Sequence, residues 1–169
     1  EIRYPQKHVD LLVDCVDNSD TLPHSTRIFI PWATISFFSR NVRPEALLKP
    51  LRTYATQKDR FCCFMFGNTT LSPQARFRYE FYARFNRVIP VDQCSGVQRR
   101  SEHLYNEAVE IYRPYKFCIA FENADNKGWV TEKIINAFLA GCVPLYCGPA
   151  DVTRFFNKNA FIDYHDFDS

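Results

Sequence analysis

The sequence predicts an α/β fold with a doubly wound, mostly parallel, Rossmann-like sheet. Short apolar runs rich in β-branched and aromatic residues alternate with stretches of helical pattern, which is typical of parallel strands covered by helices on both faces. The 169 residues, 46% of them hydrophobic, suffice for one such domain with a real core. Helix punctuation agrees, because Pro44 and Pro73 suit first-turn positions and Gly141 follows an apolar helical face as a stop.

The expected elements follow in order along the chain. Strands are expected at His8–Cys15, Arg27–Trp32, Arg60–Phe66, Val88–Val91, Lys116–Phe121, Val143–Cys147 and Ala160–Asp163. Helices are expected at Pro44–Thr56, Pro73–Phe85, Glu102–Tyr112, Thr131–Ala140 and Ala150–Phe156. Because residues 17–24 are rich in turn formers, residues 1–26 are interpreted as a partial N-terminal segment or linker, and residues 27–169 as one Rossmann-like domain.

Composition excludes several classes of partner and site. The formal net charge of +2 is too small to indicate a nucleic-acid or membrane-surface partner. No apolar stretch approaches the ~18 residues that a membrane span needs, and the first residues lack signal-peptide character. The seven cysteines form no C-x-x-C pair, and Cys62, Cys63 and Cys118 lie inside apolar runs. Buried free thiols are therefore favoured over a zinc site or a disulfide framework.

A strand, a loop and a helix in succession form the candidate anion site. The apolar run Tyr115–Phe121 leads into polar residues, and a helix opens after Gly128. Free N–H groups and the partial positive charge at a helix N-terminus stabilise a diphosphate without a metal ion. Lys133 adds a full positive charge, Glu132 offers a carboxylate to a ribose diol, and Trp129 offers an aromatic face for stacking.

Several short motifs occur here in a fixed order. They are Phe121-Glu122-Asn123, Val130-Thr131-Glu132-Lys133, Asn136-Ala137, Ala140-Gly141, Val143-Pro144, Gly148-Pro149 and Phe161-Ile162-Asp163. In order and spacing they resemble the signature of the α-1,3/α-1,4-fucosyltransferase family. Upstream, residues 60–68 resemble the family's strand that ends in a Ser-Asn pair, with Gly67 in place of the serine. The resemblance covers roughly residues 60–167.

The resemblance implies the C-terminal, donor-binding half of a GT-B glycosyltransferase, with residues 27–169 as its nucleotide-sugar (GDP) binding domain. The implied reaction is an inverting transfer of L-fucose from GDP-fucose to an oligosaccharide or glycoprotein acceptor, with no metal ion or other cofactor. The family's general base lies in an N-terminal acceptor domain, upstream of everything matched here. Animal members act in the Golgi in protein glycosylation, whereas bacterial members are cytoplasmic, so the resemblance alone leaves the compartment open.

The family's site residues carry over position by position. The resemblance assigns diphosphate binding and leaving-group stabilisation to Arg78 and Lys133, with Arg76 as a competing register for the arginine. It assigns nucleotide contact to Asn123 and ribose binding to Glu132. The implied donor site also includes Asn68, Glu122, Trp129, Val130 and Thr131. Trp129 stands where the family commonly has tyrosine, which keeps an aromatic face but loses a hydroxyl group.

Alternatives from other classes stay open on the sequence. One is a glycosyltransferase that uses another nucleotide sugar, because the residues above bind diphosphate and ribose more than the sugar. Another is a non-catalytic nucleotide-binding module. A dinucleotide-dependent oxidoreductase is disfavoured, because the chain has only five glycines and no G-x-G-x-x-G motif. The acidic motif Asp166-Phe167-Asp168 is interpreted as a turn rather than a metal site.

Overall fold

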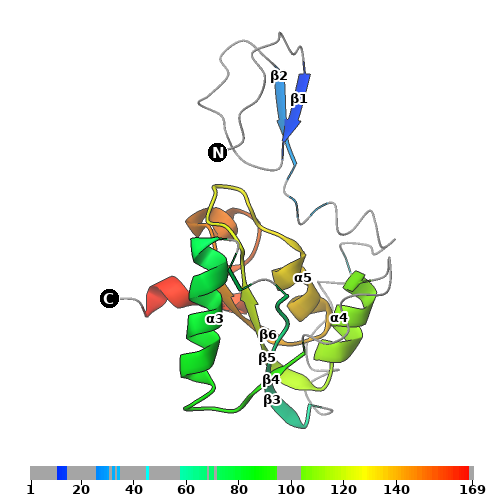
Figure 1. Cartoon of the computed structure of the whole chain (residues 1–169). Coiled ribbons are helices and arrows are strands. Elements are labelled where there is room, and N and C mark those ends of the chain that lie inside the picture. The colour runs from blue at the N-terminus through cyan, green and yellow to red at the C-terminus, as the bar shows by residue number, and fades with distance from the viewer. Residues whose placement is uncertain are drawn as a thin grey trace.

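A five-stranded parallel sheet forms the centre of the fold and confirms the predicted α/β class (Figure 1). The computed structural model describes residues 11–14, 26–30, 32, 34, 45, 58–67, 69–70, 72–94 and 104–167. The strands lie in the order β4-β3-β5-β6-β7. Their bounds are β3 Arg60–Phe64, β4 Val91–Gln93, β5 Tyr115–Phe121, β6 Val143–Cys147 and β7 Ile162–Asp163. The helices are α3 Pro73–Phe85, α4 Leu104–Tyr112 and α5 Glu132–Leu139, with 3-10 turns η2 Ala150–Arg154, η3 Lys158–Ala160 and η4 Tyr164–Asp166.

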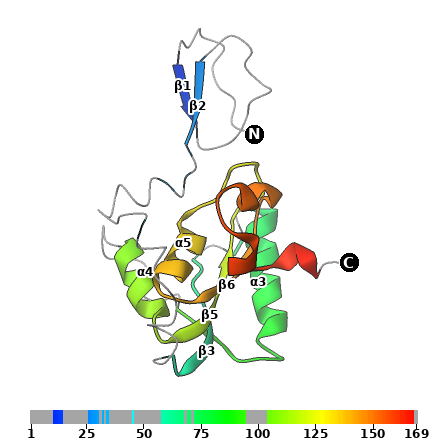
Figure 2. The same ribbon diagram turned by 180° about the vertical axis from the view of Figure 1, so that it is seen from behind.

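Two further strands form a separate parallel pair, β1 Leu11–Asp14 with β2 Thr26–Phe29. In both views this pair lies beyond one end of the central sheet (Figures 1 and 2). The expected boundary between residues 26 and 27 therefore falls at the start of β2, and the division into domains stays a prediction. Among the described residues, no helix combines the length and apolar character that crossing a membrane requires.

The two faces of the sheet are covered by different helices, as Figures 1 and 2 show. Alternate residues of a strand point to opposite faces, so neighbours in sequence join different clusters. Phe64, Ile119 and Phe121 pack with aromatic side chains of α3. Cys63 and Cys118 pack on the other face, against α4 and α5. Helices on both faces explain why the strands read as nearly continuous apolar runs.

The strand order reverses between β3 and β5. After β3 the chain passes through α3 to β4 on one side, whereas after β5 it passes through α5 to β6 on the other. The loops that leave β3 and β5 therefore diverge, and α/β folds bind ligands in the crevice that such divergence opens. Ser72 joins the two sides, because it caps α3 by accepting from the Ala75 amide at 3.0 Å and donates to the Asn123 carbonyl at 2.8 Å.

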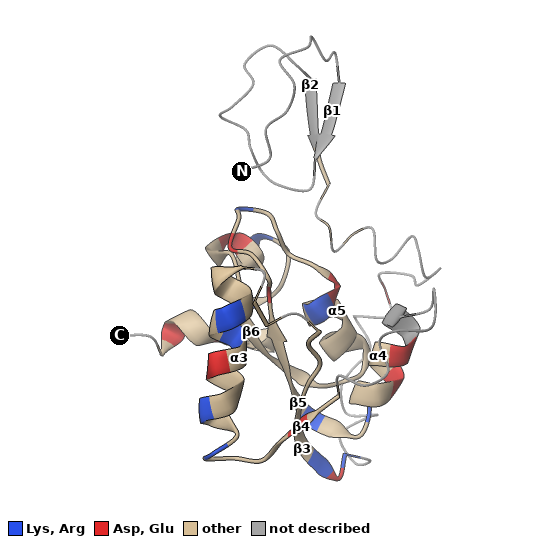
Figure 3. Ribbon diagram, in the orientation of Figure 1, with Lys and Arg blue, Asp and Glu red and all other residues tan. Residues whose placement is uncertain are grey.

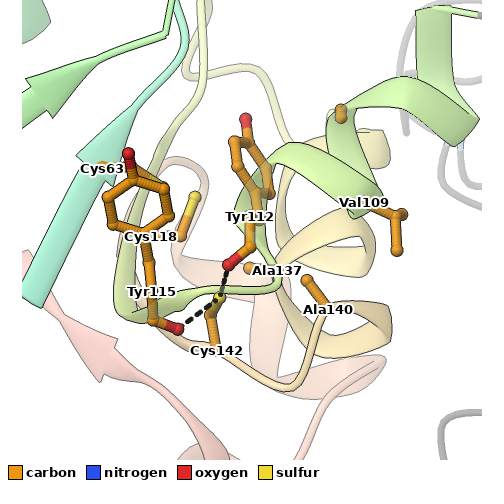
Figure 4. Close-up of a cluster of buried hydrophobic side chains, with 9 residues drawn as sticks. Cys63, Val109, Tyr112, Tyr115, Cys118, Ala137, Ala140 and Cys142 are labelled. Atoms are coloured by element: carbon orange, nitrogen blue, oxygen red, sulfur yellow. Dashed lines mark hydrogen bonds between the residues drawn. The ribbon is translucent and has the colours of Figure 1, made fainter. Parts of the chain in front are cut away.

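Buried thiols lie beneath α4 and α5, as Figure 4 shows, and the buried Lys58 holds the ends of these helices. The Cys142 sulfur lies 3.1 Å from the backbone carbonyl oxygens of both Tyr112 and Tyr115, so its single S–H can donate to either of them. The Lys58 ammonium group donates to the Arg113 carbonyl at 2.8 Å and to the Ala140 carbonyl at 2.9 Å, which are at the ends of α4 and α5. All six described cysteines are free, as the sequence predicted.

Two predicted elements were misplaced, and several others, which include residues outside the described ranges, can be compared only in part. The strand expected at Val88–Val91 begins only at Val91, because a turn follows α3 and leaves Val88 79% exposed. The helix expected at Ala150–Phe156 is the 3-10 turn η2, which starts with a bond from the Val152 amide to the Pro149 carbonyl. The expected helix Pro44–Thr56 lies outside the described residues except at residue 45, and Asn68 lies outside them too. Pro73 and Gly141 have the predicted roles, with Gly141 at φ 72° after α5.

Candidate functional site

The loop between β5 and α5 forms one wall of the candidate site. It turns through Gly128, whose φ of 80° suits a residue without a Cβ. The Trp129 amide donates to the Asn126 carbonyl at 2.8 Å. Thr131 is the N-cap of α5, but its side chain makes no capping hydrogen bond. The first amide groups of α5 are therefore not capped by that hydroxyl, which is the condition for receiving an anion.

Glu122 is the buried centre of this wall. Its side chain is fully buried and accepts three hydrogen bonds. These come from the Thr131 amide at 2.8 Å, the Thr131 hydroxyl at 2.7 Å and the Lys133 ammonium group at 2.9 Å. The sequence reading placed Glu122 among the donor-contacting residues. In the structure its carboxylate fixes the end of the loop and the position of Lys133, and contact with a donor stays a prediction.

Lys133 lies at the rim of the site with 19% of its side chain exposed. Besides Glu122, its ammonium group contacts the Thr131 hydroxyl at 2.7 Å and the Glu132 carboxylate at 3.7 Å. Burial acts to lower the pKa of Lys133, but the charges of Glu122 and Glu132 outweigh it and raise that pKa above its ordinary value. Lys133 is therefore a fixed positive charge at the start of α5.

Arg78 approaches the same carboxylate from α3. Its side chain is buried, at 3% exposure for the residue, whereas Arg76 on the same helix is exposed. Burial lowers the pKa of Arg78, and the Glu122 charge opposes that shift. The charge of Arg78 also acts on Lys133 and lowers its pKa slightly against the effect of Glu122. Helix geometry thus brings Arg78, and not Arg76, to the buried charges. Figure 3 shows the basic positions that α3 and α5 carry on the two sides of the sheet.

A cavity of about 250 Å³ opens at the carboxyl end of the sheet. Its lining comes from the start of α3, the ends of β5 and β6 and the turn η4, and includes Phe77, Phe121, Glu122, Gly148, Tyr164 and His165. The Phe77 ring stacks on Phe121, with centroids 6.1 Å apart and planes 6° from parallel. A Cβ built on Gly148 would lie 2.5 Å from the Tyr146 hydroxyl oxygen and 2.8 Å from Glu122 Cγ. Glycine at this position therefore permits the close packing behind the cavity.

The remaining predicted residues lie around the same loop with different exposure. Val130 is fully buried and belongs to the core cluster beneath α5, so its side chain faces away from the cavity side of the sheet. The Asn123 Oδ1 and Trp129 Nε1 atoms are buried and have no hydrogen-bond partner among the described residues. Buried polar atoms of this kind mark places where a ligand or water completes the bonding. Within the described residues, no group of three or more His, Cys, Asp and Glu side chains is arranged to hold a metal ion.

Sequence reasoning missed Phe77, Tyr164 and His165, which reach the cavity from segments outside the matched motifs. His165 Nε2 lies 3.1 Å from the Gly148 carbonyl oxygen, so the C-terminal turn packs directly on the end of β6. Only the position of Gly148 carried a signal, since Gly148-Pro149 was one of the motifs. The aromatic residues read as core because nothing in their spacing separates a cavity wall from a buried cluster.

Known proteins resemble this chain in sequence and in fold. The model of the glycosyltransferase family 10 (fucosyltransferase) C-terminal region matches residues 55–169. An α-(1,3)-fucosyltransferase of Helicobacter pylori is 35% identical over 107 residues, which are 63% of this chain and 22% of that protein. A 4-galactosyl-N-acetylglucosaminide 3-α-L-fucosyltransferase of Mus musculus is 43% identical over 117 residues, which are 66% of this chain and 31% of that protein.

A crystal structure of an α1,3-fucosyltransferase with GDP-fucose superimposes with a TM-score of 0.69 at 25% identity, over 100% of this chain and 57% of that chain. The chain thus spans between a fifth and a third of the length of the two curated relatives and just over half of the solved one. The matched residues 55–169 make up more than half of the sequence. The matches to relatives and to the solved structure point to the same family as the motifs do. The chain belongs to glycosyltransferase family 10, the fucosyltransferases.

Proposed function

We propose that this chain supplies the donor-binding half of a fucosyltransferase. The enzyme transfers L-fucose from GDP-fucose to a hydroxyl group of an oligosaccharide or glycoprotein, with inversion at the anomeric carbon and without a metal ion. The observation that carries the proposal is that Arg78 of α3 and Lys133 of α5 both interact with the buried Glu122, which lines the cavity at the carboxyl end of the sheet. Related solved structures hold GDP-fucose or GDP.

The charges suit departure of a nucleoside diphosphate. Arg78 and Lys133 are two fixed cations close to the buried Glu122, and Lys133 also contacts the Glu132 carboxylate at 3.7 Å. Negative charge on the diphosphate grows as the bond to the sugar breaks, so fixed cations stabilise the transition state more than the ground state. The first amide groups of α5, which Thr131 does not cap, add partial positive charge at the same place.

Other residues of the loop suit the rest of the nucleotide. Glu132 follows the N-cap of α5, with 19% of its side chain exposed, and its carboxylate suits a ribose diol. The unpartnered atoms of Asn123 and Trp129 suit polar groups of the nucleotide. The buried Val130 and the hydrogen-bonded Thr131 hold the loop in place. We propose Asn68 as a donor-contacting residue from its sequence motif. The cavity wall of Phe77 and Phe121 suits an apolar face of the donor.

The acceptor and the general base belong to a second domain in this proposal. In a two-domain glycosyltransferase that domain brings the acceptor hydroxyl and its base to the donor, and loss of a general base typically lowers rates ~10²–10⁴-fold. The chain alone should therefore bind GDP-fucose and transfer fucose very slowly. A version extended upstream should transfer fucose to N-acetyllactosamine-type acceptors.

Calorimetric titration with GDP, UDP and GDP-fucose, with and without a divalent metal chelator, tests the donor proposal. We expect GDP and GDP-fucose to bind in the presence of chelator and UDP to bind more weakly. A strict metal requirement contradicts the proposed mode of diphosphate binding. Equal affinity for UDP favours another nucleotide sugar, and donor binding without transfer by the extended version favours a non-catalytic module.

A further inference from the structure

An aromatic pair joins the N-terminal part of the chain to the candidate donor loop. The indole rings of Trp32 and Trp129 stack with centroids 5.7 Å apart and planes 25° from parallel. Stacked aromatic pairs stabilise a contact beyond the apolar area that they bury. Trp129 belongs to the loop between β5 and α5, whereas Trp32 lies shortly after β2 and outside every motif of the family signature.

A second contact supports the same placement of this segment. Phe29, the last residue of β2, lies against Phe155 with ring centroids 6.0 Å apart, and the Arg154 guanidinium carbon lies 5.9 Å from the Phe29 ring centroid. The turn η2 that ends at Arg154 is itself tied to the donor loop, because the Gly128 amide donates to the Asp151 carboxylate at 3.1 Å. Two aromatic contacts therefore reach one connected patch, formed by the loop and η2.

The backbone on either side of Trp129 makes that contact consequential. Gly128 precedes it with a positive φ, a backbone conformation that glycine adopts without strain. Val130, which follows, is fully buried, and the next residue, Thr131, is hydrogen-bonded to Glu122. Trp129 thus lies between Gly128 and the hydrogen-bonded Thr131, four residues before Lys133. The Gly128 amide donates to Asp151 and the Trp129 amide to the Asn126 carbonyl, so hydrogen bonds hold the backbone here. The stack on Trp32 adds a contact that holds the indole ring itself.

Trp129 also carries a donor that a ligand would satisfy. Its indole Nε1 is buried and has no acceptor among the described residues. An indole N–H is a donor only, and leaving it unpaired in a buried position costs free energy. A stack that fixes the ring also fixes the position of this N–H before a ligand arrives.

We propose that Trp32 is a positioning residue of the donor site. By stacking on Trp129 it holds the loop of residues 122–131 in the conformation that receives the nucleotide, and the stack persists in the bound state. This inference rests on the proposed function, because the nucleotide is the ligand whose binding it assists. Trp32 acts through Trp129 and makes no contact with the donor itself.

The test uses the two tryptophans as reporters, since the chain has no others. Stacked indoles give an exciton couplet in the far-ultraviolet circular dichroism spectrum, so Trp32→Phe and Trp129→Phe should each remove it. GDP affinity is measured by calorimetry on the unaltered protein, Trp32→Leu, Trp32→Phe and the control Phe61→Ala. Phe61 is 44% exposed on β3 and packs on Phe117, away from the loop.

We expect Trp32→Leu to weaken GDP binding about threefold to tenfold, the scale of one aromatic pair. Trp32→Phe should restore affinity to within about twofold, since a ring remains to stack. Phe61→Ala should leave affinity unchanged, and equilibrium unfolding checks that each variant is folded. In the unaltered protein the couplet should persist at saturating GDP.

Contrary results separate the inference from the function on which it rests. If the unaltered protein binds GDP and Trp32→Leu binds it as tightly or more tightly, Trp32 does not position the loop or competes with the ligand, and the inference fails alone. Loss of the couplet at saturating GDP overturns it without any variant. If the unaltered protein binds no GDP, the proposed function fails and the inference fails with it.

Discussion

Replacing Glu122 by glutamine tests the charge arrangement at the base of the site. The carboxylate is fully buried and accepts from the Thr131 amide, the Thr131 hydroxyl and Lys133. A glutamine side chain keeps one acceptor oxygen. Its amide group would face donors whose hydrogen bonds the second carboxylate oxygen accepts in the unaltered protein. Lys133 and Arg78 would also lose the negative charge with which both interact.

The size of the effect follows from these contacts. Hydrogen bonds to charged groups are worth about 1.5–3 kcal/mol each, and breaking a buried ion pair costs about 3–5 kcal/mol. Lys133 keeps 19% of its side chain exposed, so water can solvate its ammonium group in part when the ion pair is lost. We therefore expect Glu122→Gln to lower the free energy of unfolding by about 2–4 kcal/mol. Saturating GDP should recover part of that loss, since the diphosphate supplies negative charge to the two unpaired cations.

Urea unfolding of the unaltered protein and of Glu122→Gln, with and without GDP, measures this change in the free energy of unfolding. Glu110→Gln is the matched control, because Glu110 pairs with Arg113 on the surface with 66% of its side chain exposed. That change should alter the unfolding free energy by less than about 1 kcal/mol. A loss at Glu122 no larger than the loss at Glu110 would refute the view that this carboxylate fixes the loop and Lys133.

Three further predictions come from packing and from thiol ionisation. Gly148→Ala should destabilise the fold by about 1–3 kcal/mol in urea unfolding, because its methyl group would overlap the buried Tyr146 hydroxyl; an unchanged midpoint would contradict the packing. Hydrogen bonding with the Cys63 thiol lowers the pKa of the Cys94 thiol to about 7. The rate of alkylation at Cys94, measured as the part that Cys94→Ser abolishes, should therefore rise through about pH 7 and not through about pH 8.5. Burial raises the pKa of the Cys142 thiol to about 12. The free energy of unfolding should therefore be unaffected by this thiol below about pH 8.5, where an unfolded thiol is protonated, and should fall by about 1.4 kcal/mol per pH unit between there and about pH 12. Cys142→Ala should flatten that alkaline slope, and an unchanged slope would count against the burial.

Local signals were enough to predict most of the fold. Pro73 begins α3 and Gly141 ends α5 because each has a backbone preference that acts without help from distant residues. The start of β4 was misplaced because it depends on a side-chain contact across a turn, in which Asn86 Oδ1 accepts from the Val91 amide at 2.8 Å. Such a contact leaves no periodic pattern in the sequence.

The site divides in the same way. The motif around Lys133 was recognisable because a strand, a loop and a helix N-terminus follow one another in the chain. The structural task of Glu122 was not, since only the fold brings three donors onto one carboxylate. Trp32 and the cavity wall at Phe77 are tertiary contacts between distant segments, so sequence spacing held no information about them.

The most direct test of the central claim is GDP binding by calorimetry, in chelator, to the unaltered protein and to Arg78→Ala and Arg76→Ala. Both arginines belong to α3, but only Arg78 is buried toward Glu122 and Lys133, whereas Arg76 is exposed. We predict that Arg78→Ala weakens GDP binding by about 1.5–3 kcal/mol, the scale of a charge-assisted hydrogen bond, and that Arg76→Ala changes it by less than about 0.5 kcal/mol. Equal effects, or a larger effect at Arg76, would contradict the placement of the diphosphate between α3 and α5.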